Sequence, residues 1–73
     1  MTGSSGLRKH SLTIAGHRTS ISLEEAFWEA LRRIAAEQRR SLAGLVAEID
    51  AARGSANLSS AIRLYVLATE RRA

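Results

Sequence analysis

The spacing of hydrophobic residues changes once along the chain, at about residue 24. Before that point, apolar and polar residues alternate, which is typical of a β-strand with one buried face. The pattern predicts a strand at about 11–23 that shows its inner face first in Leu12 and Ile14 and then, in the opposite parity, in Thr19, Ile21 and Leu23. Gly16 lies at the change of parity, so this glycine marks either a bulge or a turn between two short strands.

After residue 24 the apolar residues follow a period of 3.6, which predicts helices at about 24–38, 42–53 and 58–71. Ser41 and Asn57 stand where N-caps of the second and third helices are expected. The predicted inner faces are Phe27, Ala30, Leu31 and Ile34, then Leu42, Leu45, Val46 and Ile49, and then Leu58, Ala61, Ile62, Tyr65 and Thr69.

These elements predict a mainly α-helical fold with a short N-terminal β-strand, formed by one domain over residues 7–73. The Ser- and Gly-rich residues 1–6 are expected to be a flexible tail or a cloning remnant. The segment 58–71 is apolar around so much of its circumference that it should pack on another subunit or across the first two helices. Trp28 fits either a dimer interface or an exposed partner contact, whereas Phe27 fits the core.

Composition limits the function classes. The chain has 73 residues and no cysteine, so its small core is expected to gain stability by homodimerisation instead of from disulfides or a thiolate metal site. We expect no cofactor and no metal, and neither His10 nor His17 stands near a carboxylate in sequence. No nucleophile and base are paired, so an enzyme is not expected. No apolar run is long enough for a membrane span, which favours a cytoplasmic protein.

The charge is basic and unevenly placed. Eleven Lys and Arg face seven Asp and Glu, for a net charge of +4, and residues 1–23 hold Arg8, Lys9 and Arg18 without any acidic residue. A cationic strand of this kind suits a polyanionic partner such as double-stranded DNA.

The segment 18–49, RTSISLEEAFWEALRRIAAEQRRSLAGLVAEI, resembles the ribbon-helix-helix domain. A basic residue, alternating apolar and hydroxyl residues and an acidic helix start run without a gap from Arg18 to Glu25, and a short turn leads to Ser41. The resemblance implies an intertwined homodimer whose paired strands enter the DNA major groove, with 58–71 as an additional C-terminal helix. It further implies a bacterial, nucleoid-associated transcriptional regulator, most simply a repressor.

The resemblance also implies which residues contact DNA. Arg18, Ser20 and Ser22 would face outward from the ribbon and contact base edges. Phosphates would be held by the start of the second helix and by nearby basic side chains, which are Ser41, Leu42, Arg39, Arg40, Arg8, Lys9 and His17.

Two positions allow other interpretations. Ser22 and Glu25 have the spacing of a capping box, which would hold the Ser22 hydroxyl at a helix start. Arg39 stands where the family usually has a glycine in a left-handed conformation.

The apolar segment 58–71 also suits an alternative function, in which an antitoxin-like or adaptor dimer binds a second protein.

Overall fold

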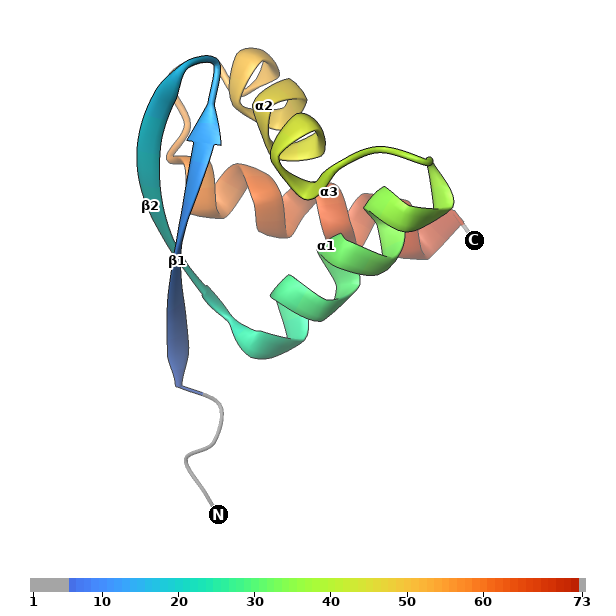
Figure 1. Cartoon of the computed structure of the whole chain (residues 1–73). Coiled ribbons are helices and arrows are strands. Elements are labelled where there is room, and N and C mark those ends of the chain that lie inside the picture. The colour runs from blue at the N-terminus through green and yellow to red at the C-terminus, as the bar shows by residue number, and fades with distance from the viewer. Residues whose placement is uncertain (1–5, 73) are drawn as a thin grey trace.

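The computed structural model describes residues 6–72 as a β-hairpin followed by three helices (Figure 1). The elements are β1 (Leu7–Ile14), β2 (His17–Glu24), α1 (Glu25–Glu37), α2 (Leu42–Ala52) and α3 (Leu58–Arg72). The mainly helical fold with an N-terminal β-region and an additional C-terminal helix is thereby confirmed. No helix within residues 6–72 is both long and apolar enough to cross a bilayer. The predicted tail at 1–6 lies outside the described residues except for Gly6, which is exposed.

The change of parity at Gly16 is a turn. Ala15 and Gly16 have φ angles of 53° and 84°, and they join Ile14 directly to His17 in an antiparallel pair. Positive φ at both central residues is the requirement of a type I′ hairpin turn, whose twist matches that of the strands. Two paired strands therefore occupy the region where the alternation predicts a strand at about 11–23.

This pairing corrects the expectation that β2 needs a second copy of the chain. The register runs from Leu7 opposite Glu24 to Ile14 opposite His17, so every residue of β2 has a partner in β1 of the same chain. The sequence hid β1 because Arg8, Lys9 and His10 interrupt its alternation of apolar residues. The homodimer itself stays a prediction.

One core lies between the hairpin and the helices. The side chains of Leu23, Trp28, Leu31, Leu45, Val46 and Ile62 are fully buried in it, and Ile21 and Ile14 complete its strand side. On α1 the buried stripe is Trp28, Leu31, Ile34 and Ala35, whereas Phe27 is only half-buried. Leu31 and Ile34 were predicted correctly, but Trp28 and Ala35 are buried in place of Phe27 and Ala30. The error arises because Phe27 and Trp28 are adjacent and either one continues an apolar stripe with Leu31.

The helix ends follow the capping signals. Ser41 accepts a hydrogen bond from the Gly44 amide at 2.9 Å, and Asn57 accepts one from the Ser60 amide at 3.0 Å. Each cap satisfies one amide of the first helical turn. A side chain at Gly44 would meet the Ser41 hydroxyl at 2.9 Å, so the cap accounts for this glycine.

Arg39 adopts the left-handed conformation itself. Its φ is 58°, and the amides of Arg39 and Arg40 donate to the carbonyls of Ala36 and Ala35 at 3.0 and 2.9 Å. These two bonds form a Schellman motif at the end of α1. The turn thus has the geometry that glycine usually supplies, with an arginine in its place.

Helix α3 packs across the rest of the chain. It contacts α1, α2 and β2, and its buried residues are Ile62 and Val66. Of the two predicted arrangements for this segment, packing across the first two helices is thereby confirmed. Leu64 and Leu67, on the other side of α3, are 64% and 50% exposed.

The turn gives a testable prediction. Ala15→Asn should raise the free energy of unfolding by about 1 kcal/mol, since asparagine tolerates a left-handed φ that costs alanine energy. Urea unfolding monitored by circular dichroism measures the change.

Ala15→Val is the matched control, and it should lower the stability, because a β-branched side chain is strained at positive φ. Equal stability of all three chains would contradict the type I′ assignment.

Candidate nucleic-acid interface

The outer face of the hairpin is formed by alternate residues of both strands. Directly opposed residues in an antiparallel pair place their side chains on the same face. The register sets Arg18 opposite Thr13, Ser20 opposite Ser11 and Ser22 opposite Lys9. The hairpin outer face therefore consists of Lys9, Ser11, Thr13, Arg18, Ser20 and Ser22, all from one chain.

A contact at the centre of this face supports the assignment. The hydroxyl oxygens of Ser11 and Ser20 lie 3.4 Å apart across the two strands. All members of the face are exposed except Ser22, which is half-buried. The sequence analysis did not predict Ser11 and Thr13 as members of this face. A two-residue turn at Ala15 and Gly16 would have placed them opposite Ser20 and Arg18.

Two cations stand at diagonal corners of the face. Lys9 lies on β1 near the start of the hairpin, and Arg18 lies on β2 near its tip. Neither forms an ion pair with any residue in the range 6–72. Arg8 differs, since its Nε lies 3.6 Å from the Glu25 carboxylate. That pair is exposed and therefore weak, so an anion can compete for Arg8.

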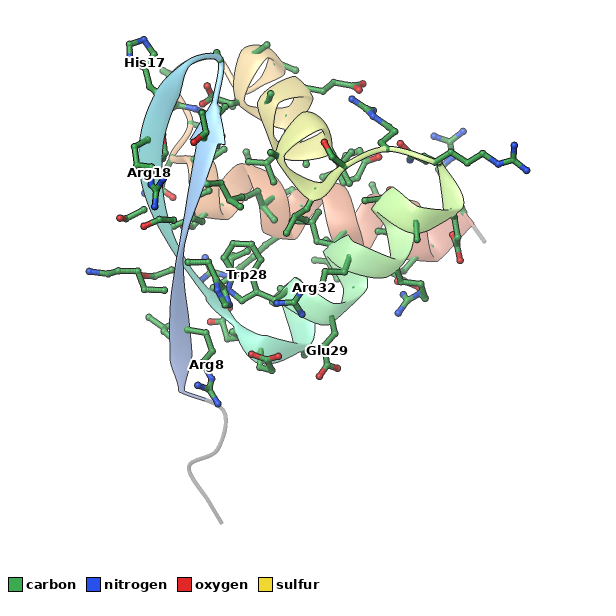
Figure 2. The ribbon with its side chains drawn as sticks, viewed as in Figure 1. Arg8, His17, Arg18, Trp28, Glu29 and Arg32 are labelled. Carbon is green, nitrogen blue, oxygen red and sulfur yellow. The ribbon has the colours of Figure 1, made fainter. Side chains whose placement is uncertain are left out.

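The hairpin inner face is held by Trp28. Its indole Nε1 donates to the Arg8 carbonyl at 2.9 Å, and the His10 ring meets it edge-on with centroids 4.6 Å apart. Figure 2 shows Trp28 between the hairpin and α1. The side chain of Trp28 is fully buried within the chain. It is therefore not an exposed partner contact or a dimer-interface residue, which were the two predicted roles. The tryptophan fixes β1 to the helices and leaves the opposite face of the hairpin free.

Helix α3 holds the outer edge of β2. The hydroxyl of Ser59 donates to the Ser22 carbonyl at 3.0 Å. The alternation of hydrogen-bonded pairs from the turn makes Ser22 opposite Lys9 a non-hydrogen-bonded pair, so this carbonyl points away from β1. The capping box is not formed, because the N-cap of α1 is Glu24 and not Ser22.

Glu24 is bound by a side chain of α3. The Arg63 guanidinium donates to both carboxylate oxygens of Glu24, at 2.9 and 3.2 Å. These bonds, with help from the backbone at Glu24, hold the pKa of the Glu24 carboxyl below its usual range. Arg63 also lies over the Phe27 ring, 5.9 Å from its centroid. The junction of β2 and α1 is thereby tied to α3.

The remaining predicted phosphate contacts lie elsewhere. Arg39, Arg40 and Ser41 belong to the turn between α1 and α2, and Leu42 is the first residue of α2. The bend of this turn lies on the right of Figure 1 and the hairpin on the left. Arg40 is engaged within the chain, since it donates to the Gly44 carbonyl at 3.1 Å and pairs with Glu48. Arg39 is exposed. One chain therefore does not bring this turn together with the hairpin outer face.

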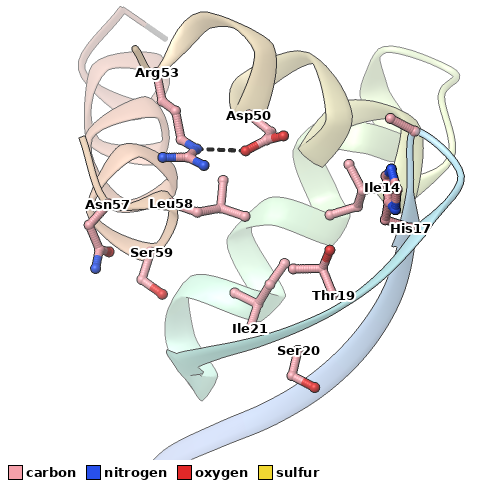
Figure 3. A pocket seen from close by; sticks show the side chains of 11 residues that line it. Ile14, His17, Thr19, Ser20, Ile21, Asp50, Arg53, Asn57, Leu58 and Ser59 are labelled. Carbon is pink, nitrogen blue, oxygen red and sulfur yellow. Dashed lines mark hydrogen bonds and ion pairs between the residues drawn. The ribbon is translucent and has the colours of Figure 1, made fainter. Parts of the chain in front are cut away.

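His17 stands at the tip of the hairpin (Figure 2). It has the parity of the inner face and lines a cavity of about 420 Å³ between the tip, the end of α2 and the start of α3. Figure 3 shows Ile14, Ile21 and Leu58 in this cavity, with the Asp50–Arg53 ion pair at its upper side. His17 is thus separated from the outer face that carries Arg18. Over residues 6–72, no three His, Asp or Glu side chains are placed to hold a metal ion.

Comparison with known proteins identifies one family. The family model described as the ribbon-helix-helix domain matches residues 7–69, which include both strands and nearly all of α3. No curated protein and no solved structure matches the chain.

The Glu24–Arg63 contact gives a prediction on pH dependence. Because the folded pKa of Glu24 is lowered, the contact stabilises the fold above the usual pKa of a glutamate. This contribution is lost as pH falls through the lowered folded pKa. In a ¹³C NMR titration, Arg63→Gln should move the Glu24 pKa upward.

The matched control is Arg33→Gln, which removes an exposed arginine that pairs with Glu70 instead. It should leave the titration of Glu24 unchanged. If both substitutions shift Glu24 equally, general charge and not the direct contact sets its pKa.

Proposed function

The chain belongs to the ribbon-helix-helix domain family, and from this we propose that it binds double-stranded DNA sequence-specifically through its hairpin outer face. Domains of this family are generally parts of DNA-binding transcription regulators and antitoxins, and they are typically not enzymes. The finer proposal is a transcriptional regulator acting as a repressor in the bacterial cytoplasm, associated with the nucleoid.

The observation that carries the proposal is the composition of the outer face. Its two cations and four hydroxyl groups all come from one two-stranded ribbon, and the Ser11–Ser20 contact supports their common orientation. The major groove of B-DNA is about 12 Å wide and admits such a ribbon. Guanine O6 and N7 accept hydrogen bonds from arginine or lysine, and hydroxyl groups bond to several bases.

Base contacts are proposed for Arg18, Ser20 and Ser22, with Lys9 beside them on the same face. The adjacent Arg8 is proposed to hold a phosphate, and His17 at the tip is suited to a phosphate at the groove edge. In this arrangement Lys9 serves as either a phosphate or a base contact, depending on how deeply the ribbon enters the groove.

The α1–α2 turn enters the proposal only through a second copy. The turn that carries Arg39, Arg40 and the N-cap Ser41, followed by Leu42 at the start of α2, does not adjoin the outer face of the hairpin of its own chain (Figure 1). A dimer can bring the turn of one copy next to the DNA held by the other. Backbone amides at a helix start and nearby arginines suit phosphate oxygens there.

A protein-binding function for α3 is the second candidate, because Leu64 and Leu67 expose large apolar side chains. Deleting α3 would not separate the two functions. Ile62 and Val66 belong to the core, so the truncated chain would lose part of its core together with the surface. Only a substitution of an exposed residue tests the surface by itself.

The DNA proposal is tested by equilibrium binding to duplexes selected from a randomised pool, measured over a salt series. Arg18→Ala should weaken binding to the preferred duplex by about 1–3 kcal/mol and relax base preference at one position. If Arg18 also neutralises a phosphate charge, the log–log salt slope should fall by about 0.9.

Arg72→Ala is the control, since it removes the same charge at the end of α3. It should leave base preference unchanged. A preference that survives Arg18→Ala would rule out base reading by this face, and salt-independent binding would rule out phosphate contacts.

A further inference from the structure

A short repeat relates the two strands of the hairpin. Residues 9–14 read KHSLTI and residues 18–23 read RTSISL. Position by position, the two segments match a lysine with an arginine, a serine with a serine, a threonine with a serine, and aliphatic residues at two further places. His10 and Thr19 are the one pair that differs in chemical kind. The hairpin therefore carries one pattern twice, with an offset of nine residues.

The register converts this repeat into a local two-fold symmetry. A pair of antiparallel strands has a two-fold axis perpendicular to the sheet, between two opposed residues. Ser11 lies opposite Ser20, and their hydroxyl oxygens meet across the middle of the hairpin outer face. Rotation about an axis between these two serines moves each β1 residue onto the β2 residue nine positions later. It therefore exchanges like with like on this face, namely Lys9 with Arg18, Ser11 with Ser20 and Thr13 with Ser22.

The buried side of the hairpin has the same symmetry. The rotation exchanges Leu12 with Ile21 and Ile14 with Leu23. Ile14, Ile21 and Leu23 are buried in the core, and Leu12 is packed against it. Both strands thus enter the core through aliphatic residues at equivalent positions. The symmetry belongs to the whole hairpin and not to its polar side chains alone.

β1 takes the place that a second copy of β2 would have in a ribbon built from two chains. Such a ribbon is symmetric because its strands are identical. Here the three outer residues of β1 stand where the second Arg18, Ser20 and Ser22 would stand. The diagonal positions of the two cations follow from this arrangement. One chain therefore supplies both halves of a nearly symmetric face.

The two halves are alike in position but unequal in chemistry. Arg18 presents a planar fork that can bond to guanine O6 and N7 together, whereas the ammonium group of Lys9 is a point charge. Thr13 carries a methyl group, which suits contact with the methyl group of thymine, and Ser22 has none. Ser22 is also half-buried, whereas Thr13 is exposed. The two strands are thus suited to related but different bases.

The symmetry of a DNA-binding element is mirrored in its site, since equivalent residues contact equivalent bases of the two DNA strands. We infer that the hairpin of one chain reads an imperfect palindrome, in which Arg18 contacts one half and Lys9 the equivalent place of the other. This inference rests on the proposed function and names the kind of sequence that the outer face recognises. It requires one hairpin and no strand from a second copy.

The test is selection of duplexes from a randomised pool, followed by affinity measurements on single base-pair variants of the preferred duplex. The natural chain should select an inverted repeat with two similar but unequal halves. A base-pair change at the position read by Arg18 should weaken binding about tenfold or more, and the change at the symmetry-related position read by Lys9 should weaken it less. Sedimentation of the complex counts the chains on each duplex, so that one inverted repeat can be assigned to each chain.

Two double variants make the strands alike on the outer face. Lys9→Arg with Thr13→Ser gives both strands the outer residues of β2, and it should select an exact palindrome built from the half that Arg18 reads. Arg18→Lys with Ser22→Thr gives both strands the outer residues of β1, and it should select an exact palindrome built from the other half. Circular dichroism checks that both variants keep the native fold.

The control is Arg72→Lys, which makes the same kind of exchange at the end of α3. It should leave the two halves unequal. A natural chain whose hairpin selects equal halves, or a sequence without inverted symmetry, overturns the inference and leaves the proposed function standing. So does an unchanged motif in both double variants. A chain without any sequence preference overturns the proposed function as well.

Discussion

A two-stranded hairpin is marginal in water by itself, so the outer face exists only because its inner face is anchored to the helices. Trp28 provides the central anchor, with the indole N–H bonded to the Arg8 carbonyl and the ring against His10. Ile21 and Leu23 bury the other strand beside it. The polar outer face can then consist of short hydroxyl side chains that contribute little to stability, because the buried inner face stabilises the hairpin.

This anchoring changes what a second copy has to do. When strands pair between chains, the ribbon and the dimer form together. Here the ribbon closes through the Ala15–Gly16 turn within one chain, and α3 covers the core from the other side through Ile62 and Val66. The ribbon therefore folds within one chain, without strands from a second copy.

Much of the fold could be predicted from the sequence because periodicity and caps are local signals. Ser41 and Asn57 start their helices as the capping rule predicts, and the alternation from Thr19 to Leu23 gives the buried face of β2. The register of the two strands, in contrast, depends on contacts between residues that are distant in sequence. β1 carries Arg8, Lys9 and His10 in a row, and only the pairing with β2 shows that His10 lies on the inner face, opposite Ile21 and against Trp28. The pairing of Ser11 with Ser20 follows from a turn that the sequence left open.

The same limit explains the division of the candidate site. The family resemblance grouped the hairpin with the α1–α2 turn because it implies that the start of the second helix holds a DNA phosphate beside the ribbon. Whether they meet in space depends on the direction of α1, which carries the turn to the far side of the molecule. A pattern along the chain holds no information on that direction.

The position of Trp28 has a practical consequence. It is the chain's single tryptophan, and it lies directly beneath the strand that carries Lys9. Indole emission responds to the polarity and hydrogen bonding around the ring. A small shift of β1 against Trp28 should therefore alter the wavelength or the intensity of the emission maximum. The molecule therefore contains an intrinsic fluorescent probe of its own ribbon, and occupancy of the hairpin can be followed without attaching a dye.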